Sequence, residues 1–214
     1  MPTTDVIDVL ADIEPDSAID RLRARRPESR RHAQGSYDAL FDPADTAHAS
    51  LAERAAVATF VAALHEQDSA IAHYQALLAR EDERLVSTVV HLAETAVTLA
   101  PEGPYGEFAG ENAPESAPGP RFVITDVAST YILGDRLSAA LEHAHLLTLH
   151  PRDAAPADLQ RLEDAGWSAT GIVTLSQLVA FLAFQLRVVA GLRVLQDARA
   201  AVDPAASISE GAGR

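Results

Sequence analysis

Polar side chains gather in the stretch Leu64–Tyr74, LHEQDSAIAHY, between two alanine-rich apolar runs. His65 and His73 could exchange a proton near neutral pH, and Glu53, in the preceding apolar run, could act as a general base. A carboxylate within an apolar helix is costly unless it is paired, so Glu53 needs a cation such as Arg54, an exposed position or a place in a site. We therefore take Glu53, His65 and His73 as the candidate catalytic or ligand-binding groups.

Histidine spacing gives little support to a dedicated metal site. On one continuous helix, His65 and His73 would lie about 12 Å apart along the axis, too far to share one ion. The segment Glu142–His145, EHAH, has the Glu-x-x-His spacing of di-iron helical bundles, but the sequence holds no second copy of that pattern. A metal-binding helical bundle remains an alternative without an evident set of ligands, and we predict no cofactor.

Composition excludes several classes of chemistry. The chain has 214 residues and no cysteine, so thiolate nucleophiles, disulfides and thiolate metal sites are impossible. Its basic residues are all arginine, which excludes Schiff-base chemistry on lysine. A net charge of −14 disfavours binding to nucleic acid or to anionic membranes. Phosphate-binding glycine loops, dinucleotide fingerprints and GxSxG elbows do not occur in the required context.

The elements that must position these groups are helices. Apolar residues recur at helical spacing in several stretches, and no stretch alternates with the period of a strand. Proline at a first turn, glycine after a last turn and Ser168 as a cap mark several boundaries. The pattern predicts an all-α fold with helices over 51–64, from the polar break to about 80, over 82–99, 131–149, 156–165 and 168–195.

The chain divides into three parts on composition. We predict an N-terminal helical extension over residues 1–42, a helical domain over 43–200 and a flexible tail over 201–214. Within the domain, residues 100–122 are rich in proline and glycine and are expected to form a long loop.

The longest apolar segment, Ile172–Leu192, approaches the length of a membrane span. It contains Gln177, Gln185 and Arg187, so we interpret it as a buried helix rather than a membrane helix. The first ten residues have no basic segment followed by an apolar run, so no signal peptide is expected. A cytoplasmic protein with no membrane partner is the resulting expectation.

Two stretches carry a resemblance to a known family. The first is LAERAAVATFVAAL, a polar break and a helix containing His73; the second is LTLHPRDAAPADLQRLEDAGWSATGIVTLSQLVAFLAFQLRVVAGL. Together they resemble the alkylhydroperoxidase D-like, carboxymuconolactone decarboxylase superfamily, and the second resembles its peroxidase-related branch. The likeness covers roughly residues 35–195. It implies an alkylhydroperoxidase D-like multi-helix bundle that assembles as a homo-oligomer, either a dimer or a trimer of dimers.

The resemblance also implies a site. It places Glu53 at the family's upstream acid, Gln67 and Ala70 at the two cysteines of its Cys-x-x-Cys motif, and His73 at the histidine that follows. A thiol peroxidase cycle is excluded, because neither Gln67 nor Ala70 carries sulfur.

Two functions then stay open besides the metal-binding bundle. The chain is either a non-redox homologue that binds a small ligand, such as an organic acid, or partners a related subunit, or an acid–base enzyme acting on a lactone or organic acid. In both cases we expect Glu53, His65 and His73 to line one cavity, at the place where the family keeps its active site.

Overall fold

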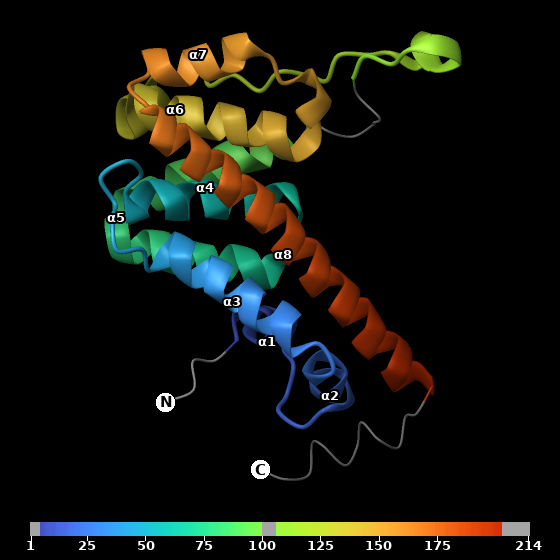
Figure 1. Ribbon diagram of the computed structural model, residues 1–214. Coiled ribbons are helices and arrows are strands. Elements are labelled where there is room, and N and C mark those ends of the chain that lie inside the picture. The colour runs from blue at the N-terminus through green and yellow to red at the C-terminus, as the bar shows by residue number, and fades with distance from the viewer. Residues whose placement is uncertain (1–4, 100–105, 203–214) are drawn as a thin grey trace.

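The structure is a computed structural model that describes residues 5–99 and 106–202. Its α-helices are α1 (Val6–Ala11), α2 (Ala18–Ala24), α3 (Pro27–Phe41), α4 (Leu51–Leu64), α5 (Asp68–Val97), α6 (Val127–Leu149), α7 (Pro156–Asp164) and α8 (Ala169–Val202). Two short 3-10 helices are Gly110–Glu115 and Pro151–Asp153. Within the described residues there is no β-strand, and one isolated bridge joins Gly106 to Ala117. The all-α prediction is confirmed (Figure 1).

Helix α4 is the buried centre of the fold. Four of its alanines are almost fully buried, as are Val57, Phe60 and Val61, since small side chains allow neighbouring helices to approach closely. The Ser50 side chain accepts a hydrogen bond from the Glu53 backbone N–H, and the Glu53 carboxylate accepts one from the Ser50 backbone N–H. Together the two bonds form a capping box at the start of α4. The helix ends at His65, and Glu66 takes a left-handed conformation with φ of 53°. The polar break predicted from the sequence is therefore the turn between α4 and α5.

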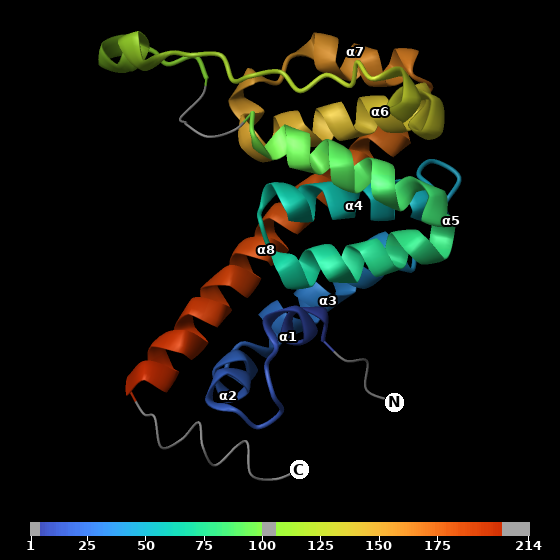
Figure 2. The ribbon, with the colours of Figure 1, turned by 180° about the vertical axis from the view of Figure 1, so that it is seen from behind.

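Helix α5 bends sharply at Asp82, whose φ of −158° and ψ of 97° are not helical. The two arms of α5 lie on either side of α4, as the view from behind in Figure 2 shows. The two helices predicted on either side of residue 81 are thus confirmed as the two arms of α5.

Helix α8 crosses the whole molecule and contacts α4, α6 and α1. One face is buried and includes Leu178, Leu182 and Leu186, whereas Val173, Phe184 and Val194 are more than half exposed. The interpretation of Ile172–Leu192 as a buried helix therefore holds for one face only, because the domain covers only one side of α8. Among the described residues, Ala169–Ala201 is the one helix long and apolar enough to span a membrane, a property that core helices share.

Helices α1–α3 pack at one end of α8, and α6 and α7 pack at the other (Figure 1). Arg23 of α2 and Arg30 of α3 form ion pairs with acids of α1 and its cap. Arg23 pairs with Asp5 at 2.9 Å and with Asp8, and Arg30 pairs with Asp8. The predicted N-terminal extension is therefore helical, and its helices α1 and α3 contact α8.

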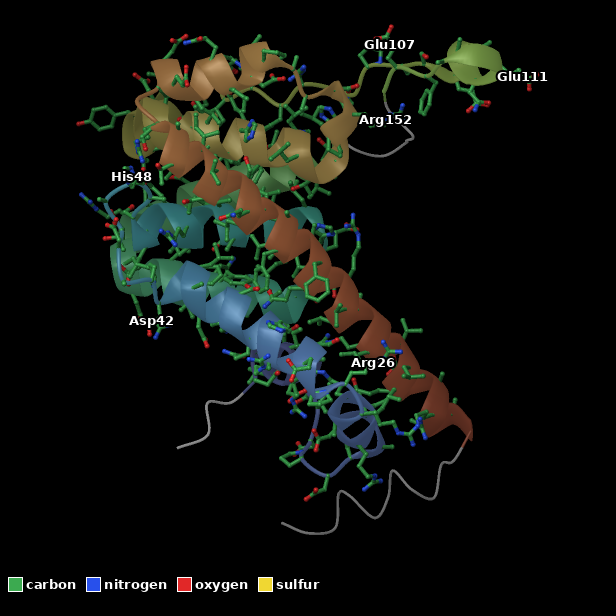
Figure 3. All side chains as sticks on the ribbon, viewed as in Figure 1. Arg26, Asp42, His48, Glu107, Glu111 and Arg152 are labelled. Atoms are coloured by element: carbon green, nitrogen blue, oxygen red, sulfur yellow. The ribbon has the colours of Figure 1, made fainter. Side chains whose placement is uncertain are left out.

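The proline- and glycine-rich segment projects from the body as an arm over residues 106–120. Figure 3 shows Glu107 and Glu111 on this arm and Arg152 at its base. Arg152 donates to the Glu107 carbonyl at 3.1 Å and lies over the Phe108 ring. Residues 100–105 of the predicted loop and 203–214 of the predicted tail lie outside the described residues.

Candidate functional site

Glu53 lies at the first turn of α4 and has structural partners. Its carboxylate accepts from the Ser50 backbone N–H at 2.8 Å and from Arg136 Nε at 2.5 Å. Arg136 in turn donates to the Gly166 and His48 carbonyls and stacks on the Trp167 ring at 3.9 Å. Glu53 therefore ties α4 to α6 and to the turn before α8, and its cation is Arg136 rather than Arg54.

Arg54, the arginine considered from the sequence, is buried. It donates to the backbone carbonyls of Ala49 at 3.0 Å and Leu40 at 2.9 Å. It holds the loop between α3 and α4.

His65 follows the last residue of α4, at the opposite end of the helix from Glu53. Twelve residues of helix separate the two by about 18 Å, so they cannot share a small cavity. The Nε2 atom of His65 is buried without a hydrogen-bond partner in the described part of the chain. Burial and the charge of Arg187 lower the pKa of His65, which favours the neutral ring.

His73 lies in the first arm of α5 and bonds to a different element. Its Nε2 is 2.8 Å from the hydroxyl of Tyr37 on α3, and its ring lies edge-on to that of Tyr74. Burial and the charge of Arg80 lower its pKa. The expected single cavity of Glu53, His65 and His73 is therefore not formed.

The positions that the resemblance assigns to the two cysteines also lack an open site. Gln67 precedes the first residue of α5 and donates to the His65 carbonyl at 3.2 Å. Ala70 is fully buried against the core. Nothing at these two positions offers an acid, a base or a nucleophile.

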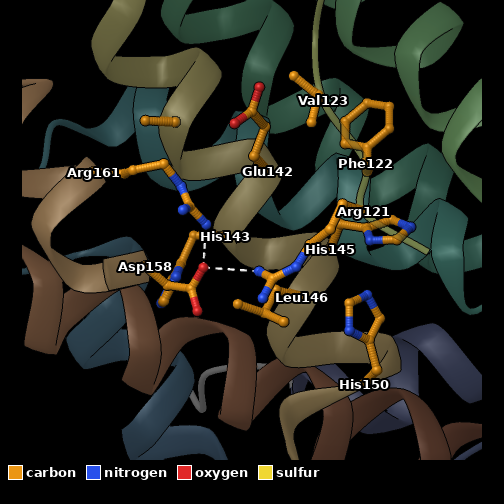
Figure 4. A pocket seen from close by; sticks show the side chains of 11 residues that line it. Arg121, Phe122, Val123, Glu142, His143, His145, Leu146, His150, Asp158 and Arg161 are labelled. Carbon is orange, nitrogen blue, oxygen red and sulfur yellow. Dashed lines mark hydrogen bonds and ion pairs between the residues drawn. The ribbon is translucent and has the colours of Figure 1, made fainter. Parts of the chain in front are cut away.

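A cavity of about 360 Å³ lies instead between α6, α7 and the segment that precedes α6 (Figure 4). The side chains that line it from α6 recur at helical spacing, which places them on one face of that helix. The lining comprises Arg121, Phe122, Val123, Ala139, Glu142, His143, His145, Leu146, His150, Asp158 and Arg161.

Asp158 is the centre of charge in this cavity and is 4% exposed. It accepts from Arg121 Nη1 at 2.8 Å, from Arg161 and from the Ala155 backbone N–H at 2.7 Å (Figure 4). Burial would raise the pKa of Asp158, but the Ala155 N–H and the two guanidinium groups together hold it below its usual value. One carboxylate thus meets two cations.

His143 lines the same cavity and is 5% exposed. Neither of its ring nitrogens has a hydrogen-bond partner within the described residues. Burial lowers its pKa, an effect that Asp158 opposes and Arg161 reinforces, so the ring is neutral at pH 7. A neutral imidazole carries one donor and one acceptor, and each of them costs about 1–3 kcal/mol when it is buried without a partner.

Two further titratable groups face this space from α6. The Glu142 carboxylate accepts from the Ile124 backbone N–H at 2.9 Å, and burial raises its pKa. His145 stacks on Phe122 with ring centroids 5.3 Å apart, and burial with the neighbouring His150 lowers its pKa to about 4.

At the wall of the cavity formed by His150, the segment after α6 lies very close to the segment that contains Gly119. His150 Nδ1 lies 3.0 Å from Asp153 Oδ2, which also accepts from the Gly119 N–H at 2.6 Å. A Cβ on Gly119 would come within 2.4 Å of the His150 ring, so a glycine is needed there.

Across residues 5–99 and 106–202, no group of three or more histidine, aspartate and glutamate side chains is arranged to hold a metal ion. Glu142 and His145, the Glu-x-x-His pair of the sequence, lie on α6 without the carboxylates of a di-iron centre. The fold and site therefore define an all-α protein with a histidine- and arginine-lined cavity. No protein-family model matches the sequence, and no curated protein matches it.

Sequence reasoning found the histidine-rich segment of this cavity but assigned no site to it. It missed Arg121, Asp158 and Arg161, because these lie far from α6 in the sequence and carry no motif. The available signal was the face of α6 itself, where Glu142, His143 and Leu146 recur three and four residues apart.

Proposed function

We propose that this chain is a non-redox binding protein whose cavity between α6 and α7 takes a small organic anion. The observation that carries the proposal is His143, a buried imidazole with two unpartnered nitrogens on the wall of a cavity. Buried polar groups are normally satisfied, so such a residue is a natural place for a ligand to bond.

The rest of the lining indicates the kind of ligand. Arg121 and Arg161 present two guanidinium groups to one buried carboxylate, which leaves donors free for an anion. Phe122 and Leu146 provide apolar wall for a hydrocarbon body. A monocarboxylate with an aliphatic or aromatic body fits this combination, and the cavity volume of about 360 Å³ falls within the usual range for small ligands.

The resemblance to the alkylhydroperoxidase D-like, carboxymuconolactone decarboxylase superfamily supports the same proposal. That resemblance assigns the family's two cysteines to Gln67, just before α5, and to Ala70, in the first turn of α5, and a cysteine-free member located in the cytoplasm is the form of the family that we propose. Such a member cannot run a thiol peroxidase cycle. Incubation with a dithiol and a hydroperoxide should consume no more peroxide than the protein-free blank.

The test of ligand binding is a thermal-shift and calorimetric screen with benzoate and hexanoate. The native protein should be stabilised, and His143→Leu should bind at least about tenfold more weakly, as expected for one lost charge-assisted hydrogen bond. Glu53→Gln and His73→Ala serve as matched controls at the positions that the resemblance assigns to the site, and both should bind like the native protein. Loss of binding in the two controls with retention in His143→Leu would refute the assignment.

Acid–base catalysis is the alternative that one observation favours. Glu142 and His143 are adjacent on α6, face one cavity and have pKa values moved in opposite directions by burial. A decarboxylase-like reaction would release carbon dioxide from a lactone acid, and Glu142→Gln would abolish the release. Binding of such a compound without any product would refute catalysis and support ligand binding as the function.

Assembly is a further part of the proposal. Val173, Phe184 and Val194 leave an apolar face of α8 uncovered, and family resemblance implies a dimer or a trimer of dimers. This face would suit a second copy or a related subunit.

A further inference from the structure

The charges around the cavity balance before any ligand enters. Arg121 and Arg161 contribute two positive charges, and Asp158 and an ionised Glu142 contribute two negative charges. An anion that enters this space adds a negative charge that nothing compensates. Since the low polarity of a partly closed cavity strengthens charge interactions, the site should recruit a positive charge with the anion.

The other charged and titratable groups of the cavity limit which group can supply that positive charge. They are Glu142 and His145 on α6, His150 directly after α6, Asp158 and Arg161 on α7, and Arg121 on the segment before α6. The arginines already carry their charge, and Asp158 is paired with both of them.

The other titratable groups of the lining already have partners. His145 is hydrogen-bonded to the Ala96 backbone and is far less basic than an ordinary histidine, with a pKa of about 4. His150 lies against Asp153, away from α7. Burial raises the pKa of Glu142, against the opposing effects of the Ile124 N–H and the Arg161 charge, so Glu142 is the competing proton acceptor that the test must separate from His143.

His143 differs from these groups, because it has an empty nitrogen for the ligand and a second one for a proton. We propose that the anion enters the cavity together with one proton, which His143 takes, so that the resulting imidazolium donates a charge-assisted hydrogen bond to the ligand carboxylate. This inference rests on the proposed function and adds its regulation by pH. The proton comes from solvent and binds the free ring nitrogen, and no covalent bond of the ligand is broken.

The coupling has a definite pH window. Burial keeps the free ring neutral below its usual titration point, and a bound carboxylate favours the charged ring. Between the pKa of the free ring and that of the bound ring, the dissociation constant should fall about tenfold for each unit of decrease in pH. The site would therefore bind its ligand more tightly as the pH falls and release it as the pH rises.

The test is calorimetric titration of the native protein with benzoate at pH 7, in two buffers of widely different ionisation enthalpy. The dependence of the measured heat on buffer should correspond to an uptake of between about 0.5 and 1 proton per benzoate bound. His143→Asn keeps a donor but cannot titrate, and should bind with no uptake. Glu142→Gln removes one negative charge from the cavity but leaves the His143 ring in place, so it should still take up a proton, though less than the native protein.

The outcomes separate the two proposals. No binding of benzoate by the native protein in either buffer would refute the proposed function, whereas binding without proton uptake would refute only the coupling. Uptake that survives in His143→Asn and disappears in Glu142→Gln would assign the proton to Glu142 and overturn the inference. If His143→Asn does not fold, nitrogen-15 shifts of the His143 ring in the native protein should move from neutral to imidazolium values on benzoate addition, and unchanged shifts would refute it.

Discussion

Acid should destabilise this protein through His145, and the effect can be calculated from its surroundings. The ring is 1% exposed, stacks on Phe122 and lies 5.6 Å from the ring of His150. Burial, reinforced by His150, lowers the pKa of His145 from 6.5 to about 4. In the unfolded chain the same imidazole titrates near its ordinary value, so unfolding takes up a proton at intermediate pH.

The sign and the size follow from this difference. The stability contributed by the neutral ring is fully present above pH 6.5 and is lost as the pH falls toward 4. Each unit of pKa difference is worth about 1.4 kcal/mol, so the loss through His145 should be about 3 kcal/mol at pH 4. Other buried histidines add to the total, which is why the measurement must compare variants.

The assay is urea unfolding of the native protein and of His145→Gln at pH 7 and pH 4. Glutamine can still donate to the Ala96 carbonyl but cannot titrate, so the variant should lose about 3 kcal/mol less than the native protein over this interval. His32→Gln, at an exposed position on α3, controls for the loss of an imidazole as such. Equal losses in the native protein and His145→Gln would refute the reasoning.

Three other predictions follow from the packing. Arg136→Ala should lower the free energy of unfolding by roughly 2 kcal/mol, because it removes three hydrogen bonds and the stacking on Trp167, and Glu53→Gln should lower it by less. A chemical unfolding curve for Arg136→Ala that matches the native one would contradict this. Tyr74→Phe should cost about 1–3 kcal/mol by leaving the fully buried Gln185 without its hydroxyl partner, and adding Gln185→Leu should recover part of the loss in thermal melts. Light scattering at micromolar concentration should give the mass of at least two chains, and a single-chain mass would remove the assembly proposal.

The helices could be predicted from the sequence because their signals are local. Apolar periodicity, Ser168 as a cap, and the polar break after Leu64 are all read within a few residues, and the structure confirms the helices they predict. The exposed face of α8 was not predictable in this way. Hydropathy records that Phe184 is apolar, but only the positions of α4, α6 and α1 decide which side of α8 is covered.

The site was harder to predict because it depends on distant residues. Glu53 was singled out correctly as a carboxylate that needs a cation, but its partner Arg136 lies 83 positions away. The pairing of Arg121 with Asp158 likewise spans 37 positions and has no sequence motif. Residue types indicated which groups could do chemistry, whereas their grouping depended on how α6 and α7 pack.

The most direct test of the account is to map where a small organic anion binds. Benzoate should be titrated into the isotopically labelled native protein while backbone amide and histidine ring resonances are followed. We predict that the largest shift changes fall on Phe122, His143 and Arg161. Changes concentrated instead on Gln67 and His73, or their absence throughout the titration, would contradict the cavity between α6 and α7 as the binding site.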